Sequence, residues 1–182
     1  MQPTKSRADL LMDLGLVAFL IALGVTARLL PHAPGFLPVA ASGLFAARTL
    51  RIPALAVIVP LAAMAISGVG FAADDWRVTL VVYGAMAVPA LAGIYSRRWS
   101  GALAIVATML SCSLFFFVST NFAVWLFSGM YALTLQGITE CYVLALPFLE
   151  KHVLGDLVWT GVLFGGAWLV QHGPALAKRP LL

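Results

Sequence analysis

Long apolar runs, interrupted by short polar or proline-containing breaks, make up most of the chain. The runs cover residues 10–30, 36–50, 52–73, 78–95, 101–119 and 153–171. A helix needs about 20 apolar residues to cross the hydrocarbon core of a bilayer, and most of these runs approach that length. The pattern therefore predicts an all-α membrane protein with six transmembrane helices.

Two apolar stretches are shorter than a typical span. Residues 36–50 form a short predicted span, and residues 137–148 are too short to cross alone. A run of about 10–14 apolar residues suits a re-entrant or half-buried helix. We therefore expect a short half-length helix before the last span, after the aromatic-rich stretch TNFAVWLFSGMYALTLQ.

The first apolar run follows two basic residues, Lys5 and Arg7. Such an arrangement resembles a signal peptide, but this run is long enough to span a bilayer and ends in no small-residue cleavage site. Pro31 and Pro34 end the run, because proline lacks the backbone N–H and clashes with the preceding helical turn. We interpret the run as a retained first helix.

The composition points to lipid as the main solvent. Of the 182 residues, 62% are hydrophobic and 10% are charged, whereas soluble domains have about 45–50% apolar and about 25% charged residues. A core of this size cannot hide so much apolar surface. The length also leaves no room for a separate soluble domain. We expect a single transmembrane domain over residues 1–182.

The basic residues occur in pairs between the apolar runs, which indicates membrane topology rather than nucleic-acid binding. With six spans and the N-terminus inside, the inner segments hold eight of the eleven basic residues: Lys5, Arg7, Arg48, Arg51, Arg97, Arg98, Lys178 and Arg179. This bias follows the positive-inside rule. It predicts a bacterial cytoplasmic (inner) membrane protein with both termini in the cytoplasm.

The remaining polar and aromatic residues concentrate in the predicted outer half, where ionisable groups within hydrocarbon often mark function. Asn121 and Trp125 lie one helical turn apart and could line a pocket for a ring-bearing solute, or form a polar hinge. Glu140 needs a partner, for which Arg28 is a candidate, unless it faces bulk water. The predicted binding residues are Arg28, His32, Asn121, Trp125, Tyr131, Glu140 and Tyr142.

Two further features have simple structural interpretations. Asp156 follows Gly155 at the predicted start of the last helix, where a carboxylate complements the positive helix end. Ala18 and Ala22 are four residues apart in the first helix, and small residues at this spacing let another helix approach closely in lipid. That helix could belong to the same bundle or to another subunit.

Enzyme signatures are weak, and we expect no enzyme. Ser128, with His152 or His172, could suggest an intramembrane serine protease, but no nucleophile turn or oxyanion motif accompanies it. There is no Walker A sequence, and the three scattered histidines form no metal motif. Cys112 and Cys141 are too few for a disulfide framework, and most simply pack as small apolar residues.

The run ALPFLEKHVLGDLVWTGVL resembles the lead into the last helix of the substrate-binding S components of energy-coupling factor (ECF) vitamin transporters. The chain length, the six spans and the alanine pair are similar too. A closer resemblance is to short bacterial membrane proteins that are themselves similar to S components. It rests on RLLPHAPGFLPVAASGLFAAR, STNFAVWL, YALTLQGITECYVLALPF and GDLVWTGVLFG.

This resemblance implies an S-component-like bundle that binds a vitamin in its outer half and delivers it inward. Ala18 and Ala22 would then meet the transmembrane coupling subunit of an ATPase module, unless the protein works alone, as in a cobalamin-transporting branch. Cobalamin is the expected solute, and Cys112 or Cys141 could ligate its cobalt, because thiolate is a soft ligand. No other cofactor is expected. The alternative from another class is a structural membrane protein that scaffolds an assembly and has no solute site.

Overall fold

The computed structural model describes residues 7–31, 35–69 and 75–176, and the side chains of these residues as far as 172. Within this part of the chain all the regular structure is helical. The elements are α1 (Arg7–Leu29), α2 (Val39–Thr49), the 3₁₀ helix η1 (Pro53–Val57), α3 (Ile58–Ser67), α4 (Trp76–Tyr95), the 3₁₀ helix η2 (Ser96–Arg98), α5 (Ala102–Phe127) and α6 (Leu135–Leu176).

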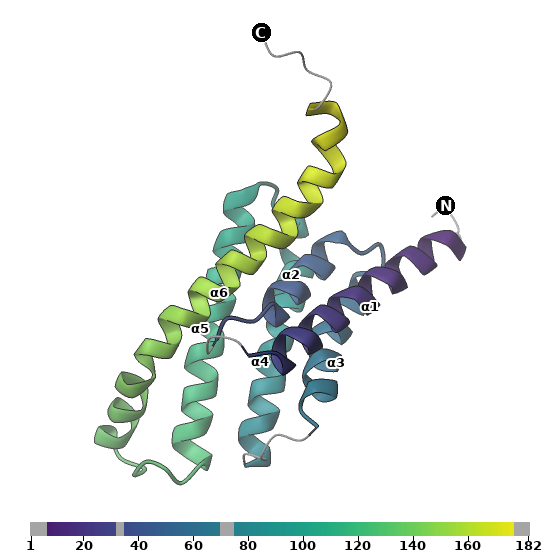
Figure 1. Cartoon of the computed structure of the whole chain (residues 1–182). Helices are drawn as coiled ribbons and strands as arrows, with labels where there is room; N and C mark the ends of the chain where they lie inside the picture. Colours follow the sequence, from purple (N-terminus) through teal and green to yellow (C-terminus); the bar gives the residue numbers. More distant parts are fainter. Residues whose placement is uncertain (1–6, 32–34, 70–74, 177–182) are drawn as a thin grey trace.

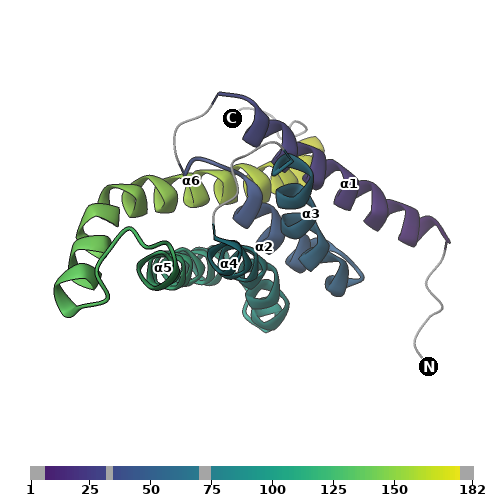
Figure 2. The ribbon, with the colours of Figure 1, turned by 90° about the horizontal axis from the view of Figure 1, so that it is seen from below.

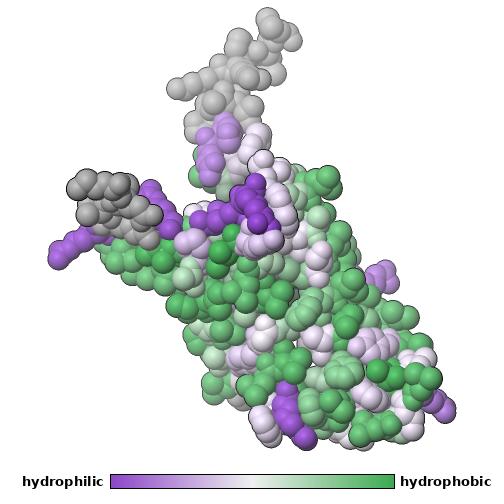
Figure 3. All heavy atoms as spheres, turned by 180° about the vertical axis from the view of Figure 1, so that it is seen from behind, coloured by the Kyte–Doolittle hydropathy of each residue, from purple (hydrophilic) through white to green (hydrophobic). Residues whose placement is uncertain are grey.

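Four helices are long and apolar enough to cross a membrane: α1, α4 with η2, α5 and α6. Their side chains cover much of the molecular surface with apolar groups, as the predominantly green face in Figure 3 shows. These properties fit the predicted all-α membrane protein. The predicted spans at residues 36–50 and 52–73 form shorter helices than these four. The first is α2, with 11 residues, and the second is divided into η1 and α3.

The short helix α2 lies at the centre of the bundle, between α4 on one side and α1 and α3 on the other (Figure 2). Every residue from Val39 to Ala47 is buried. Since neighbouring helices shield α2, its length does not have to match the thickness of a bilayer. Its alanines and glycine let these helices approach closely, which compensates for the absence of a hydrophobic driving force in lipid.

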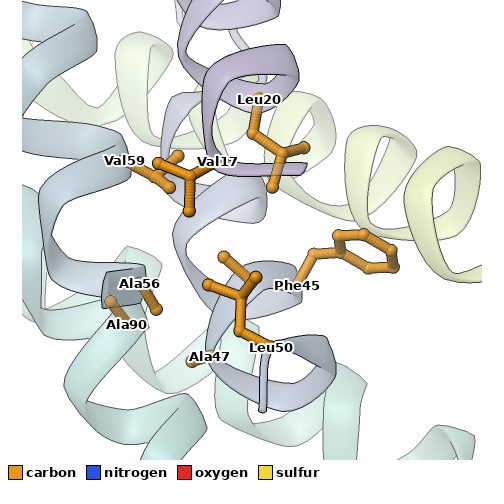
Figure 4. Close-up of a cluster of buried hydrophobic side chains, with 9 residues drawn as sticks. Val17, Leu20, Phe45, Ala47, Leu50, Ala56, Val59 and Ala90 are labelled. Atoms are coloured by element: carbon orange, nitrogen blue, oxygen red, sulfur yellow. The ribbon is translucent and has the colours of Figure 1, made fainter. Parts of the chain in front are cut away.

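The largest cluster of buried side chains joins α1, α2, η1, α3 and α4 (Figure 4). Leu20 of α1 and Leu50 at the end of α2 are almost completely buried there. Phe45 meets the ring of Phe164 from α6 edge-on, with 5.1 Å between the centroids. This cluster fixes the peripheral helix α1 and the long helix α6 to the central helix.

The prediction of a separate half-length helix is wrong. Residues 137–148 and 153–171 belong to one continuous helix, α6, of 42 residues. At 1.5 Å per residue it is about 63 Å long, roughly twice the hydrocarbon thickness of a bilayer, and it follows a curved, oblique path across the bundle (Figures 1 and 2). Pro147 inside it removes one bond from the helical ladder, which permits bending. The polar residues 150–152 resemble a loop in sequence but continue the helix.

Helix α5 is also longer than predicted. It ends at Phe127 rather than at residue 119, so Asn121 and Trp125 lie on one helix, one turn apart. The ends of α3 and α5 and the starts of α4 and α6 lie at one end of the molecule (Figure 1). At the other end, which we call the basic end, Arg48 lies in the last turn of α2, Arg51 follows α2, and Arg97 and Arg98 follow α4.

Candidate functional site

A chamber of about 330 Å³ lies between the helices on the side away from the basic end. Side chains from α1, α3, α4, α5 and α6 line it, together with the turn at residues 35–37. Its wall is mainly apolar, formed by Leu37, Met64, Val82, Met86, Phe116, Phe117, Ala145, Phe148 and Leu149. The polar side chains in the wall are Arg28, Thr120, Asn121 and His152.

Internal hydrogen bonds hold the polar side chains of the chamber in place. The Nε of Arg28 donates to Ser67 Oγ of α3 over 2.6 Å, which ties the end of α1 to the end of α3. Asn121 Nδ2 donates to the carbonyl of Phe117, and Thr120 Oγ1 donates to that of Phe116, both within α5. The chamber is therefore a preformed apolar space with a few oriented polar groups, the usual character of a small-molecule site.

A buried polar group on α5 and α6 extends from His152 in the chamber wall to residues behind it. His152 Nε2 lies 3.4 Å from Asp156 Oδ2, one helical turn further along α6. Ser113 of α5 donates a hydrogen bond of 2.6 Å to the same oxygen. The His152 ring stacks on Phe116, with 4.7 Å between the ring centroids. The predicted role of Asp156 as the cap of a helix start is wrong, because it lies in the middle of α6 and is only 1% exposed.

Two glycines position this polar group against the chamber. Gly35 has a φ of +80°, a conformation that L side chains rarely adopt, and its backbone reaches His152. A Cβ on Gly155 would lie 2.7 Å from the carbonyl oxygen of Gly35. The turn at residues 35–37 can therefore lie directly on α6 between His152 and Asp156, and it closes the chamber at this point.

The structure brings together only part of the predicted binding set. Arg28 and Asn121 line the chamber, whereas Glu140 is exposed in a separate shallow hollow with Gln136 and Thr139. The prediction that Arg28 could be the partner of Glu140 therefore has no support from their positions. His32 lies outside the described residues.

The predicted aromatic residues lie away from the chamber. Trp125 Nε1 donates to the carbonyl of Ala132 over 3.0 Å, and so ties α5 to the α5–α6 connection that contains Tyr131. The hydroxyl of Tyr142 donates to the carbonyl of Val118 over 2.6 Å. None of Trp125, Tyr131 and Tyr142 lines the chamber.

The two cysteines are buried and lie apart from the chamber. The thiol of Cys141 faces the carbonyl of Asn121 at 3.5 Å. Cys112 lines a different hollow, of about 610 Å³, between α4 and α5. By contrast, Ala18 and Ala22 are exposed on the outer face of α1 and are open to another helix.

The arrangement needed for the serine protease hypothesis is not present among the described residues. Ser128 Oγ donates to the carbonyl of Val124 and accepts from the N–H of Met130. It lines a hollow with Asp75, not with a histidine. The polar group that the sequence analysis missed is Ser113, His152 and Asp156. Its one sequence signal is the four-residue spacing of His152 and Asp156, which has meaning only if both lie on the same helix.

Comparisons with known proteins identify a family but no characterised relative. No curated protein and no solved structure matches the chain. Residues 9–177, almost the whole chain, match DUF6580, a family of unknown function. The protein therefore belongs to the DUF6580 family.

Proposed function

We propose that this protein is a substrate-binding membrane carrier that takes up a vitamin-like small molecule and holds it in the chamber. The observation that supports this proposal is a preformed space of about 330 Å³, with a mostly apolar wall and a few polar side chains on three different helices. In our proposal the protein lies in a bacterial cytoplasmic membrane, with both termini and the basic end in the cytoplasm. The chamber then lies in the outer half of the bundle.

The chamber volume bears on the identity of the solute. Sites for small ligands have volumes of about 300–1,000 Å³, so this chamber suits a vitamin with one or two rings. Cobalamin is several times larger, and to enclose it the helices around the chamber would have to separate. Ligation of its cobalt by Cys112 or Cys141 would require a similar rearrangement, since neither thiol lines the chamber. Cobalamin remains in the set of candidate solutes for testing.

The outer face of α1 supports docking to a coupling subunit. Ala18 and Ala22 are exposed there, and a Cβ on nearby Gly15 would meet nothing within 4 Å. A helix of an ECF-type coupling subunit, which connects to ATPases, could approach this face closely. Replacement of Ala18 by Trp should leave thermal unfolding unchanged and abolish co-purification with such a subunit. Equal co-purification of both proteins would count against docking at this face.

Ligand binding is the direct test of the proposal. Purified protein in detergent is heated with each of a panel of vitamins that includes cobalamin. A ligand at 100 times its Kd should stabilise the protein by about 2.7 kcal/mol. Asn121→Ala, in the chamber wall, should weaken this stabilisation, whereas Gln136→Ala, in the other hollow, should not. If no vitamin stabilises the protein, the carrier proposal fails.

A scaffold without a solute site is the second candidate. It is favoured by the internal hydrogen bonds of Trp125 and Tyr142, which give these side chains a structural role outside the chamber. A scaffold should show no stabilisation by any member of the panel and should co-purify with a larger membrane assembly. Saturable binding of one vitamin that is weakened by Asn121→Ala would exclude it.

A further inference from the structure

The side chain of Asp156 is a carboxyl group in the interior of a membrane-type helical bundle, with 1% of its surface exposed. Its Oδ2 accepts the hydrogen bond from Ser113 and lies 3.4 Å from His152 Nε2. Its Oδ1 is buried and accepts no hydrogen bond from the described residues. Burial of a carboxylate in such a place costs free energy, because an ionised group loses most of its hydration there.

The surroundings of Asp156 contain few other charged or titratable groups. On α5 the neighbouring group is the thiol of Cys112, and α3 has none. On α2 the titratable group is Arg48, whose guanidinium is bound to Ser96 and Trp99 at the basic end. On α1, Arg28 lines the chamber wall together with His152. Among the described residues, His152 is the basic group within ion-pair distance of Asp156.

At this distance the charge of the Asp156 carboxyl and that of the His152 imidazole influence each other. The pair has no net charge when it holds a single proton, on either the carboxylate or the imidazole. Loss of that proton leaves a negative charge in a low-dielectric environment, and gain of a second proton leaves a positive one. Either charge requires a compensating ion nearby.

The chamber is where such a compensating ion can bind. His152 lines it directly, whereas Asp156 is behind His152 and does not. The charged or titratable lining residues among the described residues are Arg28 and His152, both basic, and no acidic side chain is in the wall. An anionic group in the chamber therefore lies beside basic side chains of α1 and α6, and it favours the doubly protonated form of the pair.

We propose that Asp156 and His152, positioned by Ser113 and Phe116, form a proton-binding site, and that an anionic solute enters the chamber together with one proton. The anionic group binds beside the His152 imidazolium, and the proton comes from bulk water. The neutral pair thus becomes positively charged as the solute arrives, so that the pair and the solute together have no net charge. The solute part of this inference rests on the proposed carrier function, but the proton site itself does not.

The proton site is tested in the ligand-free protein. Infrared spectra recorded during a pH titration should show the C=O band of a protonated carboxylic acid that changes with pH. The component of this change that comes from Asp156 should be missing in Asp156→Asn and remain in Glu150→Gln, which alters an exposed carboxylate on the same helix. His152→Gln, which keeps Asp156, should move the pH at which the band changes. Identical pH-dependent C=O bands in the original protein and in Asp156→Asn would overturn the proton site.

The link to an anion is tested with matched pairs of compounds in a binding assay: biotin with biotin amide, nicotinate with nicotinamide, and pantothenate with panthenol. The acid of a pair should bind more tightly than its neutral partner. Its Kd should rise about tenfold per pH unit above the midpoint of the pair. His152→Gln should flatten this dependence of the Kd on pH. His172→Gln should not, because the His172 ring stacks on Trp168 near the end of α6.

The results of the two tests distinguish the two proposals. Binding that does not depend on pH and does not prefer the acid keeps the carrier function and overturns the coupling to an anion. An infrared titration that Asp156→Asn removes, without binding of any vitamin, keeps the proton site while the carrier proposal fails. Equal flattening by His152→Gln and His172→Gln would also overturn the role of His152.

Discussion

Arg48 and Arg97 each hydrogen-bond the carbonyl groups at the end of the other's helix. Arg48, in the last turn of α2, donates to the carbonyls of Ser96 and Trp99 after α4. Arg97 donates in return to the carbonyls of Ala47 and Leu50 at the end of α2. Helix ends leave carbonyl groups without partners in the helix, and cations are favourable there. These reciprocal hydrogen bonds hold α2 against α4 at the basic end.

The reciprocal hydrogen bonds predict that two adjacent arginines, Arg97 and Arg98, contribute unequally to stability. We expect Arg97→Ala to lower the free energy of unfolding by about 1–2 kcal/mol, because two carbonyls lose a charged donor. Arg98 instead stacks over the ring of Tyr95, 3.5 Å from its centroid. Arg98→Ala should cost about 0.5–1 kcal/mol, as for an exposed cation–π contact. Thermal unfolding in detergent would measure both. Equal losses would show that the reciprocal bonds add nothing.

Asp13 is predicted to be a structural anchor. It is 6% exposed on α1, and its carboxylate accepts the backbone N–H groups of Arg51 and Ile52. Asp13→Ala leaves both donors without their partner and should cost about 1–3 kcal/mol of unfolding free energy. Asp9, which forms a more exposed ion pair with the Arg51 side chain, serves as the control. Asp9→Ala should cost at most about 1 kcal/mol, and a larger effect than at Asp13 would contradict this interpretation.

Two glycines of α4 should respond oppositely to alanine. A Cβ on Gly93 would lie 2.6 Å from the Cβ of Ala47, so Gly93→Ala forces α4 away from α2. We expect a loss of about 1–3 kcal/mol from overpacking. Gly84 has nothing within 4 Å of its added Cβ, and Gly84→Ala should stabilise the helix by up to about 1 kcal/mol. Thermal unfolding of the two variants decides this, and destabilisation by both would be unexpected.

Gly155 offers a test of the chamber wall that depends on the proposed carrier function. A Cβ there would meet the backbone of the turn at 35–37, with the Cα of Phe36 at 2.9 Å. The turn would have to move, so Gly155→Ala should weaken binding of the vitamin by about tenfold, or about 1.4 kcal/mol. Gly161→Ala, on an open part of α6, should leave the Kd unchanged. Calorimetric titration of both variants would measure this, and an unchanged Kd for Gly155→Ala would place the solute elsewhere.

The pH dependence of one ion pair can be predicted with its sign. The side-chain hydrogen bond from Arg77, and then its backbone N–H, lower the pKa of Asp75 to about 2, against about 3.9 for an ordinary aspartate. The stabilisation by Asp75 is therefore complete above its ordinary pKa and is lost as the pH falls through about 2. Arg77→Gln should raise the pKa of Asp75 towards 3.9, measured by the NMR shift of its carboxyl carbon. A pKa that stays near 2 would show that Arg77 is not the cause.

The sequence by itself determined the class of this protein. Its apolar runs predict helices for lipid, and the observed bounds agree in character because hydropathy and helix propensity are properties of local sequence. Arg28 and Asn121 could be predicted as chamber residues, since polar groups within apolar runs tend to mark functional sites. The continuity of α6 could not be predicted, because the polar residues 150–152 resemble a loop until it is known which of them face inward.

Only the tertiary structure decided which helices meet and what lies between them. The length of α2 is explained by its burial, which depends on its neighbours and not on its own residues. Ser113 and Asp156 are 43 positions apart in sequence, and they share a hydrogen bond because α5 and α6 pack together. A hydropathy pattern reports how much apolar surface a segment has. The partner of a buried polar group depends on helix rotation and packing, which no local pattern contains.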